Sequence, residues 1–240
     1  MQNNKNTNFG CTNELFHTAN FLENYNLDIV RQLCGDNKSS KNVLDFGAGI
    51  GTLSILWERL FNIKPDCLEI DDNQKNIITE RGYQCYSRIG DLNKKYDLIY
   101  SSNVFEHIED DVSVMKTLKS YLAPGGIISI YVPACRSLYS YFDEYAGHYR
   151  RYQRRELINK LNEAGFVVLQ CRFVDVIGFF SWFYIKLVGK RIGLNESQLV
   201  SNKSLILYDR WIYPLSRIID KIGMQYLFGK NLLIIAKNIK

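Results

Sequence analysis

An α/β fold is the prediction from this sequence, with a doubly wound, mostly parallel sheet of seven strands and helices on both faces. Two observations lead to it. Short apolar runs alternate with amphipathic helical segments from residue 42 to residue 174, which is typical of parallel sheets. Residues 43–52 read VLDFGAGIGT, a buried strand that enters a glycine turn before a helix. The chain length of 240 residues suits one large domain.

The elements follow in order along the chain. Strands are expected at 42–46, 66–70, 84–87, 96–101, 127–132, 166–174 and 231–237. Helices are expected between them at 52–62, 72–81, 109–121 and 154–164. Gly82 and Gly165 are expected to end two of these helices, and the LAPGG sequence at 122–126 predicts a turn.

Two further segments lie outside this alternation. Residues 13–34 have helical spacing and predict an N-terminal cap helix, preceded by a disordered start at 1–12. Residues 176–230 predict a helical insertion before the last strand, with an apolar helix at 176–188, a loop at 193–204 and a helix at 205–222. We therefore expect one domain over 1–240, with its core at 42–175 and 231–237.

Composition excludes several classes of protein. The formal net charge is +5, but no continuous run of Lys and Arg appears, so no nucleic-acid partner is expected. The six cysteines are scattered and none forms C-x-x-C, so we expect no metal site. Several cysteines fall inside apolar, strand-like runs, where cysteine acts as a small core residue, and this together with the lack of an apolar N-terminal segment favours a cytoplasmic location.

The glycine turn has a diagnostic spacing. Its glycines fall at 47, 49 and 51, whereas the G-x-G-x-x-G motif of dinucleotide-binding proteins would need a glycine at Thr52. Glycines allow a positive φ and a close approach of backbone to ligand. The N-terminus of the following helix favours an anionic ligand group.

This turn resembles motif I of the class I S-adenosylmethionine (SAM)-dependent methyltransferases. Four other segments resemble the same family: YDLIYSSNVFEHI at 96–108, LAPGG at 122–126, the block from 143 to 152 that ends in GHYRRY, and AGF at 164–166. The block resembles a subgroup with GHxRRY, and the EH dipeptide follows the fourth strand. The resemblance implies a Rossmann-like fold, SAM as cofactor and methyl transfer.

Candidate cofactor residues lie where strands end, because ligands of open α/β sheets bind beyond the carboxyl ends of the strands. Glu69 is expected to accept from the ribose hydroxyls, unless Asp71 or Asp72 takes that role. Asp91 is expected at the adenine amino group, although Gly-Asp is also an ordinary turn. The full predicted set is Tyr25, Asp45, Gly47, Ala48, Gly49, Gly51, Glu69, Ile70, Asp91, Ser102 and Asn103.

Candidate catalytic residues follow the fourth and fifth strands. They are His148, His107, Arg151 and Tyr152. A histidine is the natural base near neutral pH if the acceptor must lose a proton. An arginine binds a carboxylate or phosphate with two parallel hydrogen bonds. The alternative for the arginines is internal ion pairing with Asp143 and Glu144.

The expected acceptor is a small or glycan-linked molecule. Residues 102–105 read SNVF, which lacks the [DNS]PP[YFW] element of adenine-specific DNA enzymes. Two other functions stay open. One is a non-catalytic SAM-binding subunit; the other is an NAD(P)-dependent oxidoreductase, which the glycine spacing disfavours. The sequence does not distinguish O-, N- and C-methylation.

The apolar segment 176–188 is too short to cross a bilayer. Its aromatic residues and the basic residues that follow allow peripheral membrane contact through 176–191. A lid over the acceptor, a homodimer face and a helix buried beside the sixth strand are the alternatives.

Overall fold

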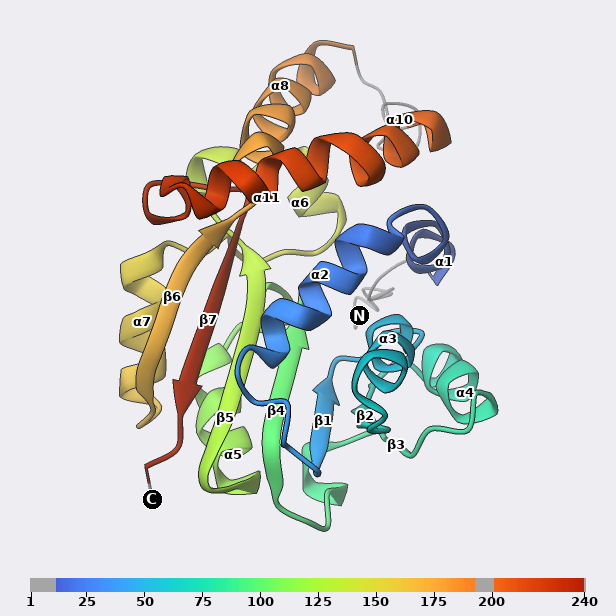
Figure 1. The fold of residues 1–240 in the computed structure, drawn as a ribbon, viewed down its shortest axis with the longest axis vertical. Coiled ribbons are helices and arrows are strands. Elements are labelled where there is room, and N and C mark those ends of the chain that lie inside the picture. Colours follow the sequence, from blue (N-terminus) through green and yellow to red (C-terminus); the bar gives the residue numbers. More distant parts are fainter. Residues whose placement is uncertain (1–11, 193–200, 240) are drawn as a thin grey trace, which may run out of the picture.

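The computed structural model describes residues 12–192 and 201–239. A seven-stranded sheet forms its centre, in the order β3-β2-β1-β4-β5-β7-β6 (Figure 1). The strands are β1 Val43–Phe46, β2 Asp66–Leu68, β3 Cys85–Tyr86, β4 Tyr96–Ser102, β5 Leu122–Pro133, β6 Val167–Val174 and β7 Asn231–Lys237. The first five pair in parallel, and β7 runs antiparallel to β5 and β6. The predicted fold class is confirmed.

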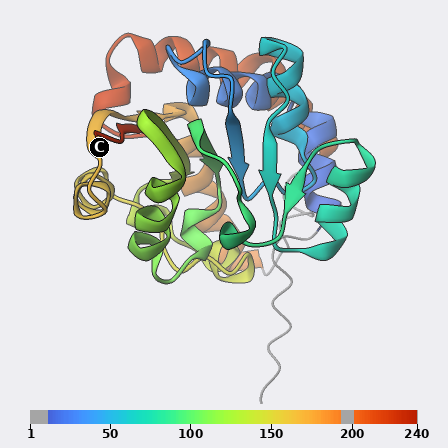
Figure 2. The same ribbon diagram turned by 90° about the horizontal axis from the view of Figure 1, so that it is seen from below.

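Helices cover both faces of the sheet (Figure 2). They include α2 Glu23–Cys34, α3 Thr52–Phe61, α4 Asp72–Glu80, α5 Asp111–Tyr121 and α7 Arg154–Glu163. Successive strand residues point to opposite faces: Leu98 and Tyr100 pack with α2 and α3, whereas Ile99 packs with α5 and α7. Two apolar layers therefore hold the sheet, and its carboxyl edge is left for a site.

The N-terminal cap is two helices and not one. The predicted helix at 13–34 breaks at Leu22, between α1 Thr12–Phe21 and α2. The carboxylate of Asp209, which lies far along the sequence, accepts from the backbone N–H groups of Asn24 and Tyr25. This distant side chain satisfies the first donors of α2, so the break is a tertiary effect. Residues 1–11 of the predicted disordered start lie outside the described residues.

The C-terminal insertion is helical, as expected, but its bounds differ. It contains α8 Val176–Ile192, α10 Asn202–Leu207, the π-helical segment η4 Tyr208–Ile212, α11 Tyr213–Lys221 and the 3₁₀ turn η5 Met224–Tyr226. The end of the predicted loop at 193–204 is already helical from Asn202, where Ser201 caps α10. The short helix α6 Tyr141–Tyr145 was not predicted. The helices α6, α8 and α11 lie beyond the carboxyl ends of β4 and β5 (Figure 1). No helix among the described residues is long and apolar enough to cross a membrane.

Candidate functional site

The glycine turn leads from β1 into α3 with left-handed backbone. Gly47, Gly49 and Gly51 have φ values of 78°, 58° and 80°, which side chains rarely adopt. A Cβ atom on Gly47 would lie 2.3 Å from the Cγ2 atom of Val104, so only glycine fits there. Gly51 precedes the first turn of α3, whose N–H groups face the turn. Within the turn, the N–H groups of Gly47, Ala48, Gly49 and Gly51 donate to acceptors of the protein itself, so the donors left at the carboxyl edge of β1 are those that begin α3.

Glu69 lies beside this turn, directly after β2. Its Oε2 atom accepts from the Gly49 N–H at 2.8 Å, and its Oε1 atom accepts from the Asp71 N–H at 2.9 Å. Burial raises the pKa of this carboxyl group above its ordinary value. A carboxylate has about four acceptor sites, so lone pairs remain for a ligand.

The competing acids near Glu69 have other surroundings. Asp71 caps α4 by accepting from the N–H groups of Asn73 and Gln74. Asp72 lies in the first turn of α4 and is exposed. Glu69 is thus the acid that contacts the glycine turn.

The side chain of Asp45 is buried beneath α3 near the end of β1, and its predicted contact with the cofactor stays a prediction. Its Oδ2 atom accepts from the Ser54 hydroxyl at 2.7 Å and from the Tyr100 hydroxyl at 3.0 Å, beneath α3. Burial raises the pKa of Asp45 to about 7. The residue connects β1, β4 and α3 and so supports the glycine turn from inside. Ala48 is likewise buried.

The other predicted cofactor residues, apart from Tyr25, lie at the surface of the carboxyl edge or close to it. Ile70 is 58% exposed immediately after Glu69. Asp91 is exposed in the 3₁₀ turn η1 Ile89–Asp91. Ser102 is half-buried at the end of β4, and Asn103 is exposed, with φ 54° and its N–H donating to the Tyr131 carbonyl. These residues leave apolar and polar groups available around the turn.

The Tyr25 side chain is directed into a polar network, and its predicted contact with the cofactor stays a prediction. Its hydroxyl lies 3.3 Å from the Tyr131 hydroxyl and accepts from Asn231 Nδ2 at 3.3 Å. Its ring packs edge-on against Tyr213, with 4.7 Å between the ring centroids. Burial raises the pKa of Tyr25.

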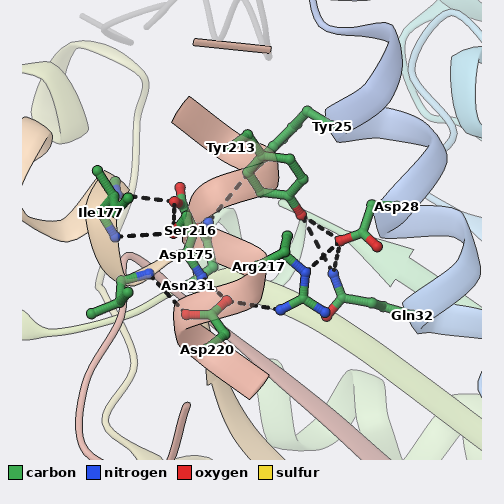
Figure 3. A network of polar contacts seen from close by, with 12 residues as sticks. Tyr25, Asp28, Gln32, Asp175, Ile177, Tyr213, Ser216, Arg217, Asp220 and Asn231 are labelled. Atoms are coloured by element: carbon green, nitrogen blue, oxygen red, sulfur yellow. Dashed lines mark hydrogen bonds and ion pairs between the residues drawn. The ribbon is translucent and has the colours of Figure 1, made fainter. Parts of the chain in front are cut away.

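The same network fixes the insertion to the N-terminal cap (Figure 3). Asp28 of α2 accepts from the Tyr213 hydroxyl at 2.6 Å and from Arg217 Nε at 2.7 Å. Arg217 also pairs with Asp220 at 2.8 Å, and Asp220 accepts from the N–H of Asp175 before α8. The cap and the insertion are therefore joined by partly buried polar contacts.

A second cluster follows β4 and α6. One ligand atom from each of Glu106, His107 and His148 lies within 4.8 Å of the others. Glu106 and His107 belong to the 3₁₀ turn η2 Phe105–His107. The Tyr149 N–H donates to the Glu106 carbonyl at 2.8 Å, which holds the His148 loop against this turn. The two predicted histidines are thus brought together, with ring centroids 4.6 Å apart.

The electrostatics of this cluster depend on burial. Burial raises the pKa of Glu106 to about 7, against the lowering effect of His148 and Arg151. Burial lowers the pKa of His107 to about 4, so its imidazole is neutral at pH 7. His148 Nδ1 lies 2.8 Å from Asp143 Oδ1, which leaves Nε2 for the cluster.

Arg151 and Tyr152, both predicted to be catalytic, have side chains that lie inward. Arg151 is buried, and its Nε donates to Asp143 Oδ1 at 2.7 Å, which is the internal pairing considered for it. The Tyr152 hydroxyl is buried and donates to Asp111 at 2.6 Å and to the Phe105 carbonyl at 3.0 Å. Burial raises the pKa of Tyr152. Both residues hold the loop in place through these contacts, and their catalytic roles stay predictions.

Sequence reasoning missed Glu106 and Asp143 as members of the site. Burial opposes ionisation of Asp143, but hydrogen bonds from His148 and Arg151 outweigh it and lower its pKa. Asp143 is therefore a carboxylate at neutral pH, and its contact with Nδ1 orients the His148 ring. The available signals were the EH dipeptide and an aspartate five residues before a histidine in the 143–152 block.

Fold and site together define the class. A Rossmann-like sheet with a glycine turn, an acid after the second strand and an antiparallel seventh strand is the architecture of class I SAM-dependent methyltransferases. The profile of the methyltransferase domain family matches residues 18–171. The chain belongs to that family, and SAM is its cofactor.

The individual relatives are only distantly similar in sequence. The chain is 27% identical over 181 residues to phosphoethanolamine N-methyltransferase 1 of Arabidopsis thaliana, covering 70% of this chain and 34% of that protein. The Triticum aestivum enzyme of the same name is 27% identical over 154 residues, covering 59% of this chain and 30% of that protein. The chain thus spans about a third of the length of these relatives.

Solved structures show the same fold. Phosphoethanolamine N-methyltransferase 2 of Haemonchus contortus, in complex with SAM, aligns with a TM-score of 0.63 and 17% identity over 98% of this chain and 59% of that chain. A SAM-dependent methyltransferase from Archaeoglobus fulgidus aligns with a TM-score of 0.61 and 18% identity over 93% of this chain and 99% of that chain.

Proposed function

We propose that this protein transfers the methyl group of SAM to a small-molecule acceptor that carries an amine or a hydroxyl. The observation that carries the proposal is the hydrogen bond from the Gly49 N–H to Glu69. It joins the glycine turn after β1 to the acid after the neighbouring strand β2. SAM brings an already activated methyl group, so the protein supplies position and electrostatics. Alignment of sulfur, methyl and acceptor atom accounts for much of the rate.

In this proposal the cofactor lies along the carboxyl edge from β2 to β4. Glu69 accepts from the ribose hydroxyls, and Ile70 lies against the adenine ring. Asp91 accepts from the adenine amino group, while Ser102 and Asn103 face the methionine part. The exposure of Ile70, Asp91 and Asn103 supports these roles, since a bound cofactor would cover them.

The acceptor is then bound by the residues after β4 and β5. The Glu106–His107–His148 cluster contributes imidazole nitrogens and, in its ionised form, a carboxylate. A positioned group of either kind takes a proton from an amine or hydroxyl. Tyr141, Tyr145 and Tyr149 are exposed in the same region. The names of the curated relatives favour a small amine such as phosphoethanolamine as the first acceptor to test. A glycan-linked acceptor is the second.

Replacing Glu69 with alanine is expected to weaken SAM binding by about 1–3 kcal/mol, or roughly 5–150-fold, because charge-assisted hydrogen bonds are lost. Calorimetric titration with SAM measures this. Asp72→Ala removes a neighbouring exposed acid and serves as the control, with SAM affinity near that of the wild type. Equal SAM affinity in wild type and Glu69→Ala would contradict the assignment.

We further propose that the insertion contacts an anionic membrane surface. Trp211, Leu215, Ile218 and Ile222 recur at helical spacing along η4, α11 and the residue after it, and are 52–77% exposed. Phe180, Phe183, Tyr184 and Leu187 form a similar exposed stripe on α8.

Charge favours a lipid surface over other occupants. In the described parts of 176–227, both acidic residues, Asp209 and Asp220, are buried, whereas Lys203, Arg210 and Lys221 are exposed. Aromatic and aliphatic side chains with basic neighbours suit the interface of an anionic bilayer.

Vesicle sedimentation tests this contact. Wild type should sediment with vesicles containing phosphatidylglycerol. Ile218→Ser/Ile222→Ser should bind these vesicles at least about 100-fold more weakly, because each isoleucine buried in the bilayer contributes roughly 1.5–3 kcal/mol and about 1.4 kcal/mol is a factor of ten. Ile239→Ser, an exposed isoleucine elsewhere, is the control. No vesicle binding by wild type would reject the proposal, and a dimer that dissociates in the double variant would assign the stripe to a second copy of the chain.

A further inference from the structure

We propose that Glu106, His107 and His148 hold a divalent cation of the zinc type on the acceptor side of the site. This metal site extends the proposed function, because the cation would bind the atom that receives the methyl group. Its role in catalysis therefore rests on that proposed function. It departs from the expectation drawn from the cysteines, because histidine and carboxylate supply the ligands.

The donor set and its geometry support a metal. The three ligand atoms lie within 4.8 Å of one another, so small side-chain movements bring them to a common centre. Two imidazole nitrogens with one carboxylate oxygen suit Zn²⁺, whereas Mg²⁺ and Ca²⁺ prefer oxygen ligands. Three protein ligands are the usual number in catalytic zinc sites, where a fourth position stays open.

Glu106 supplies the second, independent observation. Its side chain is 0% exposed, and neither carboxylate oxygen has a hydrogen-bond partner among the residues that the structure describes. A buried carboxyl group without partners is costly unless it is paired or coordinates a metal. Its oxygens lie beside the two histidines, which is where a cation would satisfy them.

The residues behind the cluster also suit a metal ligand. Asp143 Oδ1 lies 2.8 Å from His148 Nδ1 and accepts from Arg151 Nε at 2.7 Å. A carboxylate behind a histidine fixes the ring and leaves the other nitrogen for the metal. The Tyr139 hydroxyl donates to the His148 carbonyl at 2.8 Å, which also restrains this loop.

The open position defines the class of acceptor. A hydroxyl bound to the cation loses its proton more easily, as zinc-bound water does. That proton passes to water, an oxygen lone pair forms the new bond to the methyl carbon, and the carbon–sulfur bond breaks with its electrons returning to sulfur. The products are the methyl ether and S-adenosylhomocysteine. The inference thus favours an acceptor with a hydroxyl as methyl-accepting atom.

Calorimetry with ZnCl₂ on the full, chelator-treated chain tests the inference. Wild type should bind one Zn²⁺, and Glu106→Gln should bind at least about tenfold more weakly. Asp143→Asn should weaken binding by about 10–100-fold through His148. Glu144→Gln, an exposed acid on α6, is the control and should match wild type. Equal zinc affinity in wild type and Glu106→Gln would overturn the inference.

Two further readouts keep the outcomes apart. Zn²⁺ should raise the Tm of wild type and not that of Glu106→Gln. Without metal, Glu106→Gln should unfold at a Tm no lower than that of metal-free wild type, because the variant lacks a buried carboxyl group. If wild type binds SAM and transfers methyl but does not bind Zn²⁺, the metal inference fails and the proposed function stands. If wild type binds Zn²⁺ but not SAM, the proposed function fails and the metal site stands.

Discussion

Replacement of His148 with alanine is expected to lower the rate of methyl transfer by about 10²–10⁴-fold, the usual contribution of a positioned proton acceptor. Asp143 holds the ring through Nδ1, so the variant removes a pre-oriented nitrogen beside Glu106 and His107. A zinc site would lose a ligand by the same change. Steady-state kinetics with the identified acceptor measure the effect on kcat.

The cofactor side should be left intact by this change. Because His148 lies after β5 and Glu69 after β2, SAM affinity measured by calorimetry should stay within a few fold of wild type. Arg136→Ala, which removes an exposed ion pair with Glu156, is the control and should retain wild-type kcat. An unchanged kcat in His148→Ala would remove the residue from the mechanism and leave the role to His107.

Replacement of Gly49 with valine is expected to abolish SAM binding. The φ value of 58° strains any L side chain, at a cost of roughly 1–3 kcal/mol. A Cβ atom there would also lie 3.2 Å from Leu15 Cδ1 of α1. A branched side chain would therefore displace the cap helix and fill space beside the Glu69 carboxylate, where the ribose is proposed to bind. Calorimetric titration with SAM measures the loss.

A strained glycine elsewhere separates stability from binding. Gly125 has φ 76° and lies at the start of β5, with Lys237 Cε 3.5 Å from the position of its Cβ. Gly125→Val should lose a similar amount of stability and still bind SAM. If Gly49→Val folds and binds SAM as well as Gly125→Val does, the glycine turn is only a structural element.

Local patterns were sufficient to predict the sheet. The strands β1, β4 and β7 lie within a residue of their predicted bounds, because buried parallel strands are short apolar runs between turn residues. The glycine spacing also predicted the left-handed turn, because glycine adopts positive φ values that residues with a Cβ atom rarely adopt. β5 extends back through the predicted turn at 122–126, because Tyr96 pairs with Leu122 across a register shift.

The contacts that decide side-chain roles are not local. The break at Leu22 depends on Asp209, which is 185 residues from Asn24. Tyr25 was assigned to the cofactor, but Tyr131 and Asn231 hold its hydroxyl. Charge in the GHYRRY block indicated a site, yet only tertiary packing decides that Arg151 turns inward to Asp143.

The central claim, methyl transfer from SAM to a small molecule, is tested most directly by following a labelled methyl group. Wild type, Gly49→Val and His148→Ala are each incubated with methyl-labelled SAM and a panel of small amines and hydroxyl compounds that includes phosphoethanolamine. We predict that wild type moves the label to one acceptor and releases one S-adenosylhomocysteine per methyl group, while both variants are nearly inactive. Binding of SAM by wild type without transfer of label to any acceptor, in the panel or in a metabolite or glycan extract, would contradict the account and define a non-catalytic SAM-binding subunit.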